Sequence, residues 1–358
     1  MGKGVSISTI KLPILILIFA LCVMAQAVRA QHCFNKYGAI VESDAGLIKN
    51  GVLEKVVIHP QSEVGSTRRI IRKGLLTHYD NAEATVLICH GFMCDKFDAG
   101  ILRRLFPRRR FNVMVFDFRA HGENPEGQCC TFGRDEALDV IAAAKFLKNH
   151  PAVKNKPIIA YGFSMGAVAA IEAQARDSSL FKAMILDCPF DSTENVLKRG
   201  LANIKFNLFG YEFSVPCRSL LERYAFHPYV QSLVRAVLRT VAHMDPKNIM
   251  INMCRINPSQ SVGRVTVPCF FIHCKNDEKI SVEGIKSVFS RAAGHKILWL
   301  TKGRRHFDSY FYNPEKYTER IRTFLNQVLN GEFKKELQQE IIEDDDTENG
   351  IFCTRRRG

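Results

Sequence analysis

Short apolar runs alternate with segments of helical periodicity between about Leu53 and Arg305. This alternation predicts an α/β fold with a doubly wound, mostly parallel sheet and helices on both faces. The first two runs are separated by the turn-like segment Gln61–Gly65, so we expect them to form an antiparallel hairpin at one edge. The expected strands are Leu53–Ile58, Arg69–Leu76, Thr85–Cys89, Val113–Asp117, Pro157–Tyr161, Ala183–Leu186, Cys269–His273 and Ile297–Leu300.

Two stretches show the spacing of helices that lie on a sheet. The first has apolar residues at helical spacing from Ala137 to Leu147. In the second, Asn313-Pro314 suits a cap and first turn, and apolar residues from Tyr317 to Val328 line one face before Gly331. This second helix is expected to close a domain that spans residues 31–331.

The regular pattern breaks between about Ser192 and Gly263, where aromatic and apolar residues suggest irregular turns and helices without strands. Such an insertion between two strands predicts a helical lid. Its aromatic residues could form the lid's own small core or a wall that contacts the substrate.

The two ends of the chain differ from this domain. Residues 1–30 contain a nearly continuous apolar run, Leu12–Val28, followed by Val28-Arg29-Ala30 with small residues at the usual cleavage positions. This predicts a signal peptide, or an anchor if the segment is retained, and therefore an exported protein that meets the membrane only in the second case. Residues 332–358 contain an acidic run and a basic end, which predicts a solvated, disordered tail.

Charge and cysteine content add little to this assignment. The formal net charge of +14 includes Lys3, Lys11 and Arg29, so the chain without its first 30 residues carries 14 − 3 = +11. That charge suits contact with an anionic surface, although no nucleic-acid motif is present, and the arginines from Arg103 to Arg110 read as a solvated helix face. Most of the twelve cysteines, including Cys89, Cys188 and Cys269, are expected to be core thiols, and none has zinc-ligand spacing. We expect no cofactor and no metal.

The strongest chemical signal is Gly162-Phe163-Ser164-Met165-Gly166, which lies between an expected strand and a helix of small residues. Glycines two positions before and after a serine permit the sharp turn that exposes its hydroxyl beside a base. Cys89-His90-Gly91-Phe92, Asp117–Gly122 and Asn276-Asp277 each follow an expected strand. With these motifs, residues from about Leu53 to Leu329 resemble the α/β-hydrolase superfamily, close to its serine esterase, lipase and peptidase-like branches.

The resemblance implies an acyl-serine intermediate, with an acid and a histidine that follow the serine in the chain. His306 lies after the last expected strand and after the acid, so we predict a site of Ser164, Asp277 and His306. Glu278, Asp187 and Asp191 are the rival acids. The backbone N–H groups of Phe92 and Met165 are expected to hold the oxyanion.

We therefore predict a serine hydrolase that cleaves a small or lipid-like carboxylic ester or thioester. The alternatives are a peptidase or amidase of the prolyl-oligopeptidase-like branch and a non-catalytic binding protein on the same scaffold. Lys302, Arg304 and Arg305 stand where the superfamily more often has small residues. They are expected to reach into solvent, or to favour an anionic substrate if one of them points inward.

Overall fold

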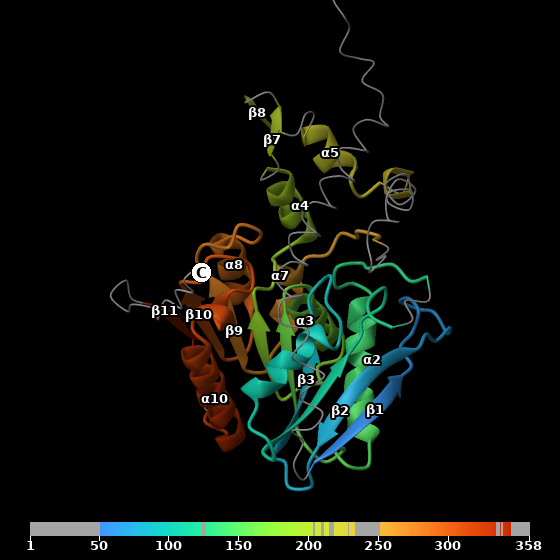
Figure 1. Cartoon of the computed structure of the whole chain (residues 1–358), viewed down its shortest axis with the longest axis vertical. Coiled ribbons are helices and arrows are strands. Elements are labelled where there is room, and N and C mark those ends of the chain that lie inside the picture. The colour runs from blue at the N-terminus through green and yellow to red at the C-terminus, as the bar shows by residue number, and fades with distance from the viewer. Residues whose placement is uncertain are drawn as a thin grey trace, which may run out of the picture.

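The computed structural model describes residues 51–123, 127–202, 205–208, 211–214, 218–227, 229–232, 251–333, 337 and 339–344. A nine-stranded sheet crosses the described part of the chain in the order β1-β2-β4-β3-β5-β6-β9-β10-β11 (Figure 1). Its strands are β1 (Val52–Ile58), β2 (Arg72–His78), β3 (Ala84–Cys89), β4 (Phe111–Phe116), β5 (Ile158–Phe163), β6 (Ala183–Asp187), β9 (Cys269–Cys274), β10 (Lys296–Thr301) and β11 (Gln339–Glu343).

Strand pairing confirms the predicted doubly wound, mostly parallel sheet. β1 pairs with β2 and β2 with β4 in antiparallel fashion, while all the other neighbours are parallel. All eight expected strands are present, and β1 and β2 form the expected hairpin at one edge. The largest shift in a boundary is at β2, which was expected to begin at Arg69 and begins at Arg72.

Helices cover both faces of the sheet (Figure 1). On one face, a core cluster joins the sheet to α2 (Glu136–Asn149), α3 (Met165–Arg176) and α8 (Val282–Arg291). On the other, a second cluster joins it to the 3-10 helix η3 (Asp98–Leu105) and to α10 (Pro314–Asn330). The caps of α10 are as expected, because the Asn313 side chain accepts from Lys316 N and Gly331 takes the left-handed conformation at φ 68°.

The insertion between β6 and β9 contains a hairpin that the sequence did not predict. α4 (Thr193–Ala202) is followed by β7 (Lys205–Leu208) and β8 (Tyr211–Ser214), which pair in antiparallel fashion, and by α5 (Arg218–Tyr224). These elements project beyond the sheet and its covering helices (Figure 1). Strands of four residues are too short to show a clear alternating pattern, which explains the omission. The other short elements are α7 (Pro258–Ser261), η5 (Val262–Arg264) and α9 (Ser309–Tyr312).

The prediction of a disordered tail is wrong for Gln339–Glu343, which forms β11 beside β10. The acidic residues around it have specific partners: Lys275 Nζ lies 2.7 Å from Glu343 Oε2, and Trp299 Nε1 donates to Asp344 Oδ1 at 3.0 Å. Composition alone had suggested a solvated segment because these partners come from distant parts of the chain.

The predicted signal peptide or anchor lies outside the described residues, as does most of the acidic and basic tail. Within the described residues, no helix is both long and apolar enough to cross a membrane. The cysteine prediction is confirmed where it was specific, because Cys89, Cys188 and Cys269 are all buried in the two core clusters.

Candidate active site

Ser164 stands at a strained turn between β5 and α3. Its backbone has φ 52° and ψ −122°, a conformation that residues with a side chain rarely adopt and that costs of order 1–3 kcal/mol. The neighbouring glycines leave room for this turn. A Cβ on Gly166 would lie 2.1 Å from the carbonyl oxygen of Cys89, and one on Gly162 would lie 2.7 Å from the backbone nitrogen of Ala167. The predicted sharp turn is therefore present.

The three residues predicted from chain order lie together. Ser164 Oγ is 2.8 Å from His306 Nε2, and His306 Nδ1 is 2.7 Å from Asp277 Oδ2. The Ser164 side chain is half-buried, and the His306 side chain is 14% exposed. A histidine placed between a carboxylate and a hydroxyl in this way can accept the hydroxyl proton while the carboxylate orients the ring.

Asp277 is held as a carboxylate. Burial alone would raise its pKa, but the adjacent His306 ring and hydrogen bonds outweigh burial and lower the pKa to about 2. Its other oxygen, Oδ1, accepts backbone N–H groups from Lys279 at 2.8 Å and Ile280 at 3.0 Å. These bonds favour the charged form and fix the side chain in its loop.

Two of the rival acids, Asp187 and Asp191, direct their side chains to partners other than His306. Asp187 is fully buried, and its Oδ2 accepts from the Tyr317 hydroxyl at 2.7 Å. The Asp191 side chain accepts from the backbone N–H of Ser192 and the amide of Asn195. Burial raises the pKa of Asp187 to about 7, so the protonated form is favoured in acidic solution, below about pH 7.

The other histidines near these strand ends occupy structural positions. His90 Nε2 accepts from Phe118 N at 3.0 Å, so Nδ1 carries the proton and donates to Gly91 O at 2.8 Å. His121 Nδ1 lies 2.8 Å from the carbonyl oxygen of Arg119. His273 is also buried, and burial lowers its pKa to about 4.

Two loops meet at Ser164, where the oxyanion was expected to bind. Met165 is the first residue of α3, directly after Ser164. The loop that contains Phe92 also passes close to Ser164, because a Cβ on Gly91 would lie 3.5 Å from Ser164 Cβ. His90 fixes this loop through its bond to Gly91 O, and Cys94 N donates to the same oxygen at 3.3 Å.

The basic residues before His306 lie at the surface to different extents. Arg304 and Arg305 are exposed and Lys302 is half-buried. The backbone N–H of Arg304 donates to Asp308 Oδ2 at 2.9 Å, which helps to order the loop that carries His306.

One contact to the loop that carries Asp277 was not predicted from the sequence. Arg199 of α4 donates from Nε to Glu278 O at 3.1 Å and from Nη2 to Asp277 O at 3.5 Å. A lone arginine in an irregular insertion carries no signal of such a contact, because it depends on how the insertion folds back. Within the described residues, no group of three or more His, Cys, Asp or Glu side chains is arranged to hold a metal ion.

Comparison with known proteins places this arrangement in a family. The model of the Alpha/beta hydrolase family matches residues 86–320, which include Ser164, Asp277 and His306. The chain belongs to the Alpha/beta hydrolase family.

Individual relatives of this alpha/beta hydrolase are distant. The chain is 26% identical over 246 residues to the uncharacterized protein YqkD of Bacillus subtilis (strain 168), covering 68% of this chain and 72% of YqkD. It is 24% identical over 253 residues to the uncharacterized protein YfhR of Escherichia coli (strain K12), covering 70% and 73%. The solved Pyrococcus furiosus esterase Pf2001 shares the fold with a TM-score of 0.57 and 23% identity, covering 78% of this chain and 93% of the esterase.

Proposed function

We propose that this protein is a serine hydrolase that cleaves a carboxylic ester or thioester through an acyl-serine intermediate. The observation that supports this most directly is the pair of short contacts from His306, 2.8 Å to Ser164 Oγ and 2.7 Å to Asp277 Oδ2. The strained turn at Ser164 adds support, because such strain persists where it serves a function.

In the first half of the reaction, Ser164 Oγ attacks the carbonyl carbon and His306 Nε2 takes the hydroxyl proton. His306 Nδ1–H donates to Asp277, which holds the ring in the required tautomer and stabilises the imidazolium. The protonated His306 then gives its proton to the leaving alcohol or thiol. In the second half, His306 takes a proton from water, the water oxygen attacks the acyl carbon, and Ser164 leaves with the proton returned by His306.

The negative charge on the carbonyl oxygen requires hydrogen-bond donors. We assign this role to the backbone N–H groups of Met165 and Phe92, since Met165 begins a helix and Phe92 follows the glycine that approaches Ser164. Loss of one such donor typically costs roughly 3 kcal/mol of transition-state stabilisation. The left-handed backbone at Met93, φ 67°, holds the turn that follows Phe92.

Two experiments test this assignment. A fluorophosphonate probe should label the wild-type protein and leave Ser164→Ala unlabelled, which would establish the nucleophile independently of any substrate. A panel of nitrophenyl esters, acyl thioesters and aminoacyl amides should then show turnover of esters or thioesters above amides. Labelling with turnover of amides alone would favour the peptidase alternative, whereas no labelling of folded protein would favour a binding protein.

A further inference from the structure

A turn that carries Phe132 packs against the start of the helix after Ser164. Phe132 has φ 60°, in the left-handed region that a phenylalanine rarely adopts. Cys130 Sγ lies 3.4 Å from Met165 Sδ, and a Cβ on Gly133 would lie 2.6 Å from Val168 Cγ1. Since Met165 and Val168 belong to the first turns of α3, the residues on both sides of Phe132 contact the helix that Ser164 precedes.

A buried carboxylate holds this turn in place. Glu136 Oε1 accepts from Thr131 N at 2.8 Å, and Glu136 Oε2 accepts from Thr131 Oγ1 and Gly133 N, each at 2.7 Å. Glu136 is 0% exposed. Burying a carboxylate is costly unless donors surround it, and here the donors come from the residues on either side of Phe132. These bonds to Glu136 therefore fix the backbone that presents the Phe132 ring.

The Phe132 ring packs against both core clusters, one on each face of the sheet. Its centroid is 4.9 Å from that of Phe92, the residue after the glycine that approaches Ser164. Both rings are only half-buried, so each leaves part of its apolar surface exposed, and the backbone at Gly91 brings the Phe92 end of this pair close to Ser164.

We propose that Phe132 is a specificity-determining residue: with Phe92, its ring forms an apolar wall of the acyl site that favours acyl groups of medium length or longer. The proposal rests on the proposed function. An acetyl group has only one methyl group beyond its carbonyl carbon and gains nothing from an apolar wall. An octanoyl chain is long enough to extend along that wall. Each buried methylene contributes to binding, so preference should grow with chain length.

The test compares kcat/KM for nitrophenyl acetate and nitrophenyl octanoate. In Phe132→Ala, we expect the octanoyl-to-acetyl ratio to fall about tenfold, the factor that corresponds to roughly two methylenes losing their contact. Phe132→Leu should restore most of the ratio, since it replaces apolar surface at the same place. An unchanged or increased ratio in Phe132→Ala would overturn the proposal.

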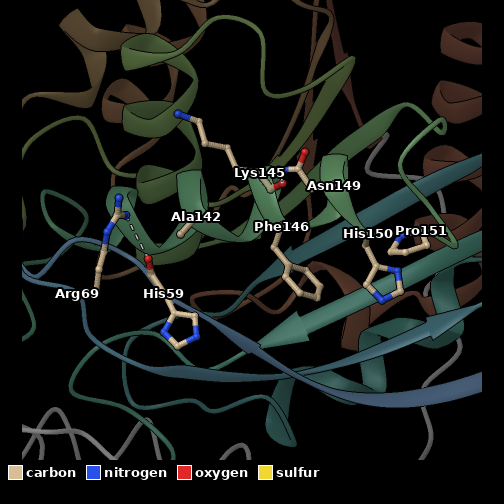
Figure 2. A pocket seen from close by; sticks show the side chains of 8 residues that line it. All are labelled: His59, Arg69, Ala142, Lys145, Phe146, Asn149, His150 and Pro151. Atoms are coloured by element: carbon tan, nitrogen blue, oxygen red, sulfur yellow. Dashed lines mark hydrogen bonds between the residues drawn. The ribbon is translucent and has the colours of Figure 1, made fainter.

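Phe146→Ala is the matched control. Phe146 is also half-buried against the same core cluster, but it lies ten positions beyond Glu136 on α2, roughly 15 Å along the helix. A groove of about 400 Å³ lies between α2 and the segment that joins β1 to β2. Figure 2 shows Phe146 among the side chains that line it. The residues that line this groove are His59, Arg69, Ala142, Lys145, Phe146, Asn149, His150 and Pro151. The octanoyl-to-acetyl ratio should stay at the wild-type value in Phe146→Ala.

Glu136→Gln tests whether the buried carboxylate positions the ring. The amide replaces one acceptor oxygen by a donor that faces another N–H or O–H group, so the turn should loosen. We expect the octanoyl-to-acetyl ratio to fall in the same direction as in Phe132→Ala, with acetate hydrolysis changed less. A lower melting temperature with an unchanged ratio would show that Glu136 only stabilises the fold.

Binding of nitrophenyl octanoate to Ser164→Ala tests the apolar wall independently of the hydrolytic reaction. Nitrophenyl octanoate should bind this variant measurably by calorimetry, and adding Phe132→Ala should weaken binding about tenfold. If the wild type neither hydrolyses esters nor reacts with a fluorophosphonate, the proposed function fails while this difference in binding still supports the wall. If hydrolysis proceeds but Phe132→Ala changes neither the ratio nor the binding, the wall fails and the proposed function stands.

Discussion

His306 Nε2 lies 2.8 Å from Ser164 Oγ, although 142 positions separate the two residues along the chain. If this contact carries the proton transfer, Ser164→Ala and His306→Ala should each lower kcat/KM by several orders of magnitude. The double variant should be little worse than either single one, because the residues act as a unit. Steady-state kinetics on all three variants, with melting temperatures to verify folding, checks this. Additive losses in the double variant would contradict the assignment.

The choice of acid gives a second prediction. Asp277→Asn should reduce turnover severely, because the amide cannot stabilise the imidazolium and can favour the wrong tautomer of His306. Asp191→Asn and Asp187→Asn should be mild, since the Asp187 carboxyl bonds to Tyr317 and the Asp191 carboxyl bonds to Ser192 and Asn195. The measurement is kcat/KM for one ester across the three variants. A ranking with Asp187→Asn or Asp191→Asn as the most damaging would move the acid to the end of β6.

The raised pKa of Asp187 also predicts how the free energy of unfolding depends on pH. Burial raises its pKa to about 7, above the ordinary value of 3.8, so the folded state holds a proton that the unfolded state has released between these values. The folded state therefore loses stability as pH rises from about 4 to about 7 through this group. Asp187→Asn removes the titration and keeps an acceptor for Tyr317. Its free energy of unfolding, relative to wild type, should increase between pH 5 and pH 8.

Denaturant unfolding at the two pH values measures this difference. A variant whose relative stability is the same at pH 5 and pH 8 would show that Asp187 is already ionised in the folded protein.

The strands of the sheet and the candidate residues Ser164, Asp277 and His306 could be picked out from local patterns in the sequence. Apolar runs mark each strand, and the residues of interest come directly after strands whose ends meet at one edge of a parallel sheet. No local pattern identifies Phe132 and Glu136. In the sequence, a glutamate that bonds to the preceding turn cannot be distinguished from an ordinary acidic residue in the first turn of a helix. β11 was missed for a related reason: its partners, Lys275 and Trp299, lie far away in the chain.

The serine turn gives a prediction with an internal control. Gly166→Ala should prevent stable folding or severely lower the melting temperature, because its Cβ would lie 2.1 Å from Cys89 O and 2.4 Å from His90 O, both rigid backbone atoms. Gly263→Ala should be tolerated, since the nearest atom to its Cβ is Arg291 O at 3.7 Å. Soluble yield and melting temperature compare the two variants. A folded Gly166→Ala protein with wild-type stability would contradict the close approach of α3 to the end of β3.

The last prediction concerns β11, which was expected to be part of a solvated tail. Its parallel ladder with β10 is reinforced at Asp344, which accepts from the buried indole of Trp299 and lies 2.9 Å from Lys316 Nζ. A chain that ends at Gln338 would lose the ladder and leave the Trp299 donor, in a residue 1% exposed, without this partner. An unsatisfied buried donor alone costs roughly 1–3 kcal/mol. We therefore expect the melting temperature to fall by about 5 °C or more.

A chain that ends at Asp344 is the control for this truncation, because it keeps β11 and the Asp344 side chain and removes only residues 345–358. The fluorescence emission of Trp299 should also differ between the two truncated chains, because its indole stays buried and hydrogen-bonded only in the chain that ends at Asp344. Asp344→Ala in the full chain removes the contacts of Asp344 with Trp299 and Lys316 but keeps the pairing of β10 with β11. It should therefore give an intermediate loss of stability. If the chain ending at Gln338 melts at the same temperature as the chain ending at Asp344, β11 adds nothing to stability, and a solvated tail would describe residues 339–344 after all.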